Sequence, residues 1–293
     1  MGAVMGINRG PYWANHLYER YGVVQPVQIL SGGDLSETWQ MQLDGRPMVV
    51  KWQPDVSSRI LLIEAATLDA LAQTGSIRVP APDWVSARLL VLQWIEPGSP
   101  ALREMAAAKL GRDLAKVHRS QRLGYCQPWG SAIGIQTSPS GIYDRGGTFF
   151  VQARLRPLLE KCAQANDTAT WLQRLREKLD VIAAGLNQAA LGPALVHGDL
   201  WAGNWLWDSA GIPYVFDPQG YYGDPQADLA FSEMFGGFPE TFYRAYREAY
   251  PTAAGYPYVR PIYQLYHALI HLLLFGAPYR RLAQALANEV LNQ

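Results

Sequence analysis

The sequence predicts an α+β protein of two lobes, a small β-rich N-terminal lobe and a larger, mostly helical C-terminal lobe. Hairpin signals and alternating apolar residues dominate the first third, and helical periodicity prevails after Pro97-Gly98. A chain of 293 residues that is 49% hydrophobic can also bury a large core. Because strands come first and helices second, we expect lobes at residues 1–94 and 95–293, with a ligand cleft between them.

The N-terminal lobe is expected to contain two hairpins and one long helix. Asp44-Gly45 divides an alternating run at 37–52, which is a strong hairpin signal. A second hairpin is expected at 84–94, where an apolar run ends the lobe. The expected helices are a short amphipathic one at 12–22 and a longer one at 58–73.

The C-terminal lobe is expected to be helical apart from a central stretch of short strands. Two short strands are predicted in residues 205–216, joined by a turn at 208–211. The other predicted elements are helices at 101–121, 149–164 and 168–190, a Gly/Ser/Pro-rich loop at 124–147 and four helical segments within 226–291.

Composition excludes several classes of protein. Lys plus Arg and Asp plus Glu number 25 each, so we expect no nucleic-acid or membrane partner. Two cysteines form neither a disulfide framework nor a four-cysteine zinc site. The longest apolar run, near 269–275, is too short to cross a bilayer, and the N-terminus lacks a signal-peptide core. We therefore expect a cytoplasmic protein.

Three oxygen-bearing side chains lie in the apolar stretch 195–218. Asp199 and Asn204 are five positions apart, and the hairpin predicted after them would return Asp217 to their side. Asn204 and Asp217 offer the hard oxygen ligands that Mg²⁺ prefers, which leaves Asp199 free to accept a hydroxyl proton. This spacing, H-x-D-x-x-x-x-N followed by an Asp after a short hairpin, is the arrangement of a kinase catalytic loop.

Two features upstream fit the same chemistry, although each has a simpler alternative. Glu64 lies on the apolar face of the predicted helix, and Lys51 is the best cation to neutralise it. The alternative is that Glu64 sits at the edge of that face and reaches water. Gly32-Gly33 would let backbone N–H groups approach phosphates, whereas most glycine pairs are plain turns.

Longer segments resemble the fructosamine kinase (ketosamine-3-kinase) family. The resemblance covers nearly the whole chain and is strongest in 197–204, 216–251 and 263–276, with agreement also at 49–52 and 110–119. It implies a protein-kinase-like fold, related to aminoglycoside and choline kinases. It also implies ATP-dependent phosphorylation of the 3-hydroxyl of a ketosamine, after which the unstable phosphate is eliminated and the amine is freed, a deglycation.

The resemblance also implies roles for individual residues. Asp199 would be the catalytic base, and Asn204 and Asp217 would hold Mg²⁺. Lys51, fixed by Glu64, would hold ATP phosphates beneath the loop at Gly32-Gly33. The remaining assignments are backbone contacts to adenine from Gln93, Trp94 and Ile95, stacking of Trp201 on the sugar, bracing of the catalytic loop by Asp228, and either substrate contact or bracing by Asp224.

Some positions depart from the family pattern and leave alternatives open. Asp34 stands where several relatives carry a cysteine linked to redox-controlled dimerisation, so that switch is not expected, and we expect a monomer or weak dimer. The loop at 126–147 also differs on the acceptor side, which bears on substrate identity. The alternative functions are a kinase of the same fold acting on another hydroxylated amine, such as an aminoglycoside or choline-like alcohol, and a non-catalytic nucleotide-binding scaffold.

Overall fold

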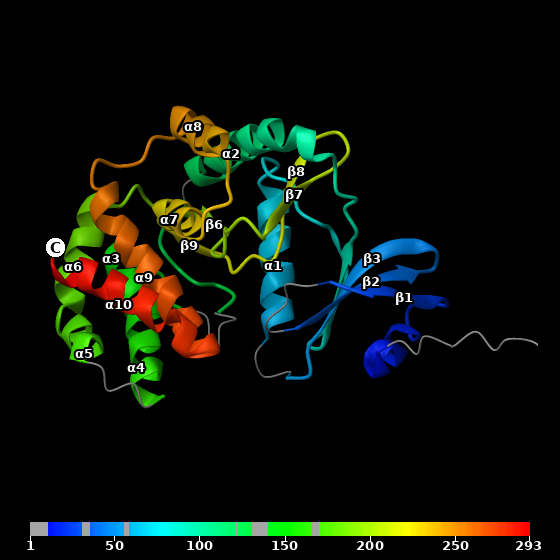
Figure 1. The fold of residues 1–293 in the computed structure, drawn as a ribbon, viewed down its shortest axis with the longest axis horizontal. Helices are drawn as coiled ribbons and strands as arrows, with labels where there is room; N and C mark the ends of the chain where they lie inside the picture. Colours follow the sequence, from blue (N-terminus) through cyan, green and yellow to red (C-terminus); the bar gives the residue numbers. More distant parts are fainter. Residues whose placement is uncertain (1–10, 31–35, 56–58, 121, 131–139, 166–169) are drawn as a thin grey trace, which may run out of the picture.

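A five-stranded sheet and a large group of helices form the two ends of the molecule. The structure is a computed structural model, and it describes residues 11–30, 36–55, 59–120, 122–130, 140–165 and 170–293. Figure 1 shows the sheet on the right, most helices on the left, and helix α1 (Ile60–Gln73) between them. The α+β fold class with a small β-rich part and a larger helical part is confirmed.

The sheet is antiparallel throughout, in the order β1-β2-β3-β5-β4. Asp44 and Gly45, at the turn between β2 and β3, both have positive φ angles, 49° and 75°, as a tight two-residue hairpin requires. Both predicted hairpins are therefore present. The strands are β1 (Val24–Ile29), β2 (Glu37–Leu43), β3 (Arg46–Trp52), β4 (Pro82–Val85) and β5 (Leu89–Gln93).

The first helical segment is shorter and tighter than its sequence predicts. It is a 3₁₀ helix, Tyr12–Leu17, rather than an amphipathic helix reaching residue 22. Trp13 stacks on Trp52 with ring centroids 5.6 Å apart, and its indole N–H donates to Glu37 at 2.7 Å. These contacts with the sheet outweigh local helical preference.

Helices α2 (Arg103–Arg119) and α8 (Glu240–Ala249) pack backbone against backbone at Gly111. A Cβ atom at Gly111 would lie 2.3 Å from the carbonyl oxygen of Phe242, so only glycine fits there. Figure 1 shows the two helices side by side at the top of the molecule. This close approach fixes where the C-terminal turn of α2 lies relative to α8.

The rest of the helical part surrounds one large core. The segment predicted as one helix at 149–164 begins earlier and includes a π-helical turn, η4 (Phe150–Leu155), and the segment at 168–190 is two helices. The other elements are η3 (Pro100–Leu102), α3 (Gly146–Phe149), α4 (Arg156–Gln164), α5 (Thr170–Glu177), α6 (Leu179–Ala189), α7 (Gln226–Met234), α9 (Tyr256–Phe275), η5 (Ala277–Tyr279) and α10 (Arg280–Leu291).

Two short antiparallel pairs hold the polar stretch described above. Strand β6 (Ala194–Val196) pairs with β9 (Tyr221–Gly223), and β7 (Trp205–Trp207) pairs with β8 (Pro213–Val215). The predicted hairpin at 205–216 is therefore present. It brings the segment 216–220 beside the loop 197–204, because Phe216 N donates to Asn204 O and Gln219 N donates to His197 O.

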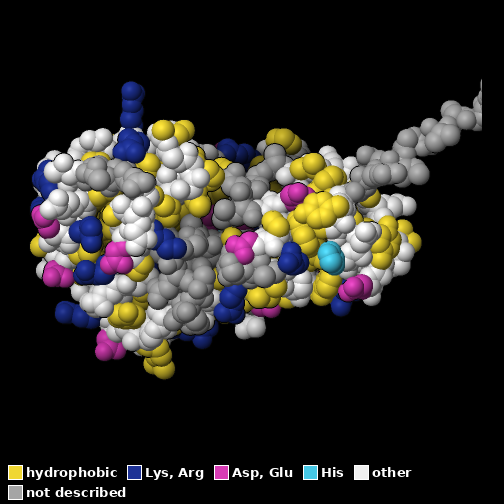
Figure 2. Space-filling view, turned by 90° about the horizontal axis from the view of Figure 1, so that it is seen from below, with side chains coloured by type: hydrophobic (Ala, Val, Ile, Leu, Met, Phe, Trp, Pro, Cys, Tyr) yellow, Lys and Arg dark blue, Asp and Glu magenta, His cyan; other side chains and the backbone are white. Residues whose placement is uncertain are grey.

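The surface carries charges of both signs. Figure 2 shows Lys and Arg side chains interspersed with Asp and Glu side chains on the face in view. Among the described residues, no helix is both long and apolar enough to span a membrane.

Candidate active site

A cavity of about 340 Å³ lies between the sheet and the loop 197–204. Its walls come from β2, β3 and β5 on one side and from the β7–β8 region on the other, so it opens between the two parts of the molecule. Gly32 and Gly33 lie outside the described residues. The lining residues are Leu30, Thr38, Val49, Lys51, Pro80, Leu92, Gln93, Trp94, Ile95, Trp201, Gly203, Asn204, Leu206, Phe216 and Asp217.

Lys51 is buried at the centre of an ion-pair network in the cavity wall. Its ammonium group lies 2.7 Å from Glu64 Oε1 on α1 and also hydrogen-bonds Asp217 Oδ1. Burial works against the charge of Lys51, but Asp217 and Glu64 outweigh it and hold the lysine pKa above its ordinary value. The predicted pairing of Lys51 with Glu64 is observed, and Glu64 does not reach water.

Asp217 adopts a backbone conformation that is uncommon for residues other than glycine. Its φ angle is 57°, in the left-handed region that Asp and Asn tolerate better than most residues. Such strain persists only where surrounding contacts enforce it, and it concentrates at functional sites. Here it turns the chain directly after β8 while the carboxylate stays bonded to Lys51.

Asn204 joins Asp199 to the cavity. Its amide nitrogen donates to the backbone oxygen and to Oδ2 of Asp199, both at 2.9 Å. Asp199 is partly buried beside the cavity rather than in its lining. Burial first, and then the negative charge of Asp217, raise the pKa of Asp199 to about 7, although the Asn204 hydrogen bond opposes them. A carboxylate with a pKa near neutrality can accept a proton during catalysis.

The donor set fits a magnesium-bound nucleotide. Since the Asn204 amide nitrogen is engaged by Asp199, its carbonyl oxygen is the atom available to a cation, next to the Asp217 carboxylate in the same cavity. Within the described ranges no cluster of three or more His, Cys, Asp or Glu side chains could hold a metal. Two protein oxygens completed by water and phosphate oxygens suit Mg²⁺, which rarely uses an all-protein cage.

The predicted adenine and sugar contacts lie on opposite walls of the cavity. Gln93 ends β5, Trp94 and Ile95 follow it, and all three line one wall. Trp201 lines the other wall and stays 38% exposed, with its ring packed over Gly203. The structure therefore brings all of these residues to one cavity, as the sequence analysis expects, while their individual roles stay predictions.

Hydrogen bonds to Asp228 and from the His197 ring hold the loop 197–204 in place. Asp228 accepts hydrogen bonds from the amides of His197 at 2.6 Å and Gly198 at 2.8 Å. The His197 ring donates from Nε2 to Phe216 O at 3.0 Å, which ties the loop to the Asp217 segment. His118 also contacts Asp228, and sequence reasoning missed it; its signal is a histidine on the apolar face of α2, four positions after Leu114.

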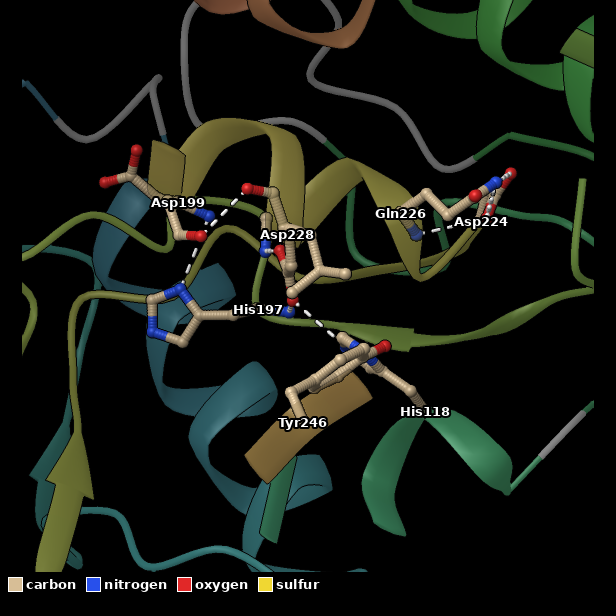
Figure 3. A network of polar contacts seen from close by, with 10 residues as sticks. His118, His197, Asp199, Asp224, Gln226, Asp228 and Tyr246 are labelled. Carbon is tan, nitrogen blue, oxygen red and sulfur yellow. Dashed lines mark hydrogen bonds and ion pairs between the residues drawn. The ribbon is translucent and has the colours of Figure 1, made fainter. Parts of the chain in front are cut away.

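Asp224 lies apart from the cavity lining. Its carboxylate is buried and accepts hydrogen bonds from Tyr263 Oη on α9 at 3.0 Å and from Gln226 N on α7 at 3.1 Å. Figure 3 shows Asp224 beside Gln226. These contacts join α7 to α9, and both roles expected of Asp224, substrate contact and bracing of the catalytic loop, stay predictions. Burial outweighs the hydrogen bonds and raises the pKa of Asp224 from 3.8 to about 6.

This raised pKa predicts that Asp224 makes the protein more stable in mild acid. Between about pH 4 and pH 6 the folded state binds more protons than the unfolded chain, so the free energy of unfolding falls as pH rises through this window. Asp224→Asn should remove a pH-dependent contribution of about 3 kcal/mol. Urea unfolding of both proteins from pH 4 to pH 7.5 measures it, with the exposed Asp180→Asn as control. Identical pH slopes for all three proteins would contradict the expectation.

The chain is similar to known kinases over most of its length. The family model for fructosamine kinase matches residues 12–293. A probable ketoamine kinase from Synechocystis sp. is 32% identical over 280 residues, covering 92% of this chain and 91% of the relative. A chloroplastic protein-ribulosamine 3-kinase from Arabidopsis thaliana is 29% identical over 276 residues, covering 92% of this chain and 83% of the relative.

Solved structures show the same fold. A putative fructosamine-3-kinase from Thermobifida fusca superposes with a TM-score of 0.80 at 27% identity, covering 96% of this chain and 98% of that one. An aminoglycoside phosphotransferase in complex with AMP-PNP and hygromycin B superposes with a TM-score of 0.67 at 18% identity, covering 95% and 97%, which shows a shared kinase-like fold alone. With a family match that leaves out only the first eleven residues, the chain belongs to the fructosamine kinase family.

Proposed function

We propose that this protein is an ATP-dependent kinase that phosphorylates the 3-hydroxyl of ketosamines, the ribulosamine- or fructosamine-type products of amine glycation. The observation that carries the proposal is the buried ammonium of Lys51 between Glu64 and Asp217, facing the cavity that Asn204 also lines. The kinase-like fold and membership of the fructosamine kinase family support the same reaction class.

Each residue has a defined part in this reaction. Asp199 aims the acceptor hydroxyl and takes its proton as the new O–P bond forms and the bond from the γ-phosphorus to the ADP oxygen breaks. Lys51 holds the phosphates of ATP, and Glu64 keeps the ammonium in place. Asn204 and Asp217 would hold Mg²⁺, which neutralises phosphate charge when bound. Most of the rate enhancement then comes from positioning and electrostatics.

The identity of the acceptor depends on residues on the sugar side of the cavity. Trp201, two positions after Asp199, presents an exposed indole to the cavity and offers a stacking surface for the sugar. Elimination of the 3-phosphate from the product would free the amine, so the net effect would be deglycation. The name of the Arabidopsis relative, a protein-ribulosamine 3-kinase, supports ribulosamines as the first acceptors to test.

An ATP-consumption assay on a panel of acceptors tests this function. The panel contains unmodified lysine, lysine glycated with ribose, erythrose or glucose, an aminoglycoside and choline. We expect turnover with the glycated lysines and none with unmodified lysine. Turnover confined to the aminoglycoside or choline would replace the ketosamine assignment, and Mg·ATP binding without turnover on any acceptor would favour a non-catalytic role.

A further inference from the structure

Asp228 occupies an interior position where an ionised carboxylate needs several hydrogen-bond donors. It is 1% exposed, and its two oxygens accept the amides of His197 and Gly198. A buried charge without sufficient donors is costly, so each donor to this carboxylate matters to the shape of the loop. The two amides immediately precede Asp199, and they therefore set where the Asp199 side chain begins.

His118 supplies a third donor from the last turn of α2. The ring is fully buried, its Nε2 lies 3.2 Å from Asp228 Oδ2, and its Nδ1 lies 2.8 Å from the hydroxyl of Tyr246 on α8. Figure 3 shows Asp228 next to His197, with His118 and Tyr246 together below it. The contacts thus form a continuous line from α8 through α2 to the catalytic loop.

The hydrogen-bonding capacity of each group decides the direction of these bonds. An ionised carboxylate only accepts, so His118 Nε2 must carry the hydrogen that points to Asp228. Despite burial, the His118 hydrogen bond and the backbone amide of Gly198 hold the pKa of Asp228 below its ordinary value, which keeps it ionised. His118 Nδ1 and the Tyr246 hydroxyl are also hydrogen-bonded, and because a hydroxyl can donate or accept, this bond orients the ring in either protonation state.

The loop 197–204 is packed too closely at Gly198 to absorb a displacement of Asp228. Gly198 has a φ angle of 78°, and a Cβ atom at this position would lie 2.2 Å from Gln219 O. The catalytic loop and the segment leading from Asp217 are therefore in close backbone contact. A shift of the two amides must move Asp199, and small misplacements of a reacting group are costly to the rate.

We propose that His118, oriented by Tyr246, is a positioning residue that holds Asp228 against the amides of His197 and Gly198 and so fixes Asp199 for catalysis. This inference rests on the proposed kinase activity. His118 and Tyr246 touch no ligand, and they act only through Asp228 and the loop backbone.

Matched substitutions in the full chain separate positioning from general packing. His118→Leu removes the donor but fills most of the space, while His118→Gln places an amide N–H where Nε2 lies. The control is His267→Leu, since His267 is also a buried histidine, stacked on Phe231 with ring centroids 3.6 Å apart, and lies outside this network. Tyr246→Phe removes one hydroxyl, and its control is Tyr243→Phe on the same helix, whose hydroxyl donates instead to Ser232 O.

We expect His118→Leu to lower kcat by about 10- to 100-fold with KM for ATP unchanged, and His118→Gln to restore most of the rate. Tyr246→Phe should cause a smaller loss that Tyr243→Phe does not. A kcat for His118→Leu within about twofold of that of His267→Leu, or no rescue by glutamine, would overturn the proposal. If His118→Leu does not fold, the comparison of Tyr246→Phe with Tyr243→Phe decides the matter.

Amide hydrogen exchange gives a readout that needs no substrate. In His118→Leu the amides of His197 and Gly198 should exchange faster than in the wild type, whereas in His267→Leu they should not. Unchanged exchange at both amides would overturn the positioning role even if the kinase activity is confirmed. Faster exchange in a protein that turns over no ketosamine would support the brace and reject the proposed acceptor.

Discussion

Asp199→Asn should lower kcat for ketosamine phosphorylation by about 10²- to 10⁴-fold, the range expected for loss of a general base, while ATP affinity stays unchanged. Asparagine keeps the shape of the side chain and its contact with Asn204, but it cannot take the hydroxyl proton. Asp199 also stands beside the cavity rather than in its lining, so the nucleotide site should be intact.

Steady-state kinetics with a glycated lysine, combined with calorimetric titration of Mg·ATP, measures both parts of this result. The matched control is Asp69→Asn, an exposed carboxylate on α1 outside the cavity, which should leave kcat and affinity unaltered. Turnover of the Asp199 variant at the wild-type rate would remove this residue from the mechanism.

Asp217→Asn should abolish the Mg²⁺-dependent part of ATP binding. The substitution removes the one carboxylate among the two oxygen ligands proposed for the metal, and hard divalent cations bind neutral amides alone poorly. Asparagine is preferable to alanine here because it tolerates the left-handed backbone at this position, where φ is 57°. Lys51 keeps its ion pair with Glu64, so loss of the metal ligand is isolated from collapse of the lysine site.

Titration of ATP at increasing Mg²⁺ concentrations tests the metal assignment. Wild-type affinity should rise with Mg²⁺, while the variant should bind ATP equally weakly with Mg²⁺ and with a chelator. A variant that retains wild-type Mg·ATP affinity would show that the metal ligands lie elsewhere.

Local sequence signals were sufficient for the elements that meet at the cavity. Asp44-Gly45 marks a hairpin because its positive φ angles suit few other residues, and the second strand of that hairpin carries Lys51. Glu64 on an apolar helix face indicates a buried partner, since an unpaired carboxylate there would be costly. The short hairpin after Asn204 brings Asp217 back to the same place.

Contacts between residues far apart in the sequence could not be predicted from local sequence signals. His118 and Tyr246 are 128 positions apart, and their meeting depends on how α2 crosses α8. The same holds for Trp13, whose stacking on Trp52 accompanies a 3₁₀ helix where periodicity predicts an α-helix. Asp224 stands out in the sequence as a polar residue near the catalytic segment. Its hydrogen-bond partners on α7 and α9 could not be predicted from the residues next to it in the sequence.

Gly111 sets the distance between α2 and α8, the helices that carry His118 and Tyr246. A methyl group there would collide with Phe242 O and also come within 3.0 Å of Tyr246 N, forcing α8 outward and Tyr246 away from His118. Such an allele would leave every ligand-contacting side chain intact, yet it would weaken folding and turnover together. Gly111→Ala should therefore lower the melting temperature and kcat together, although the substitution touches none of the proposed ligand contacts.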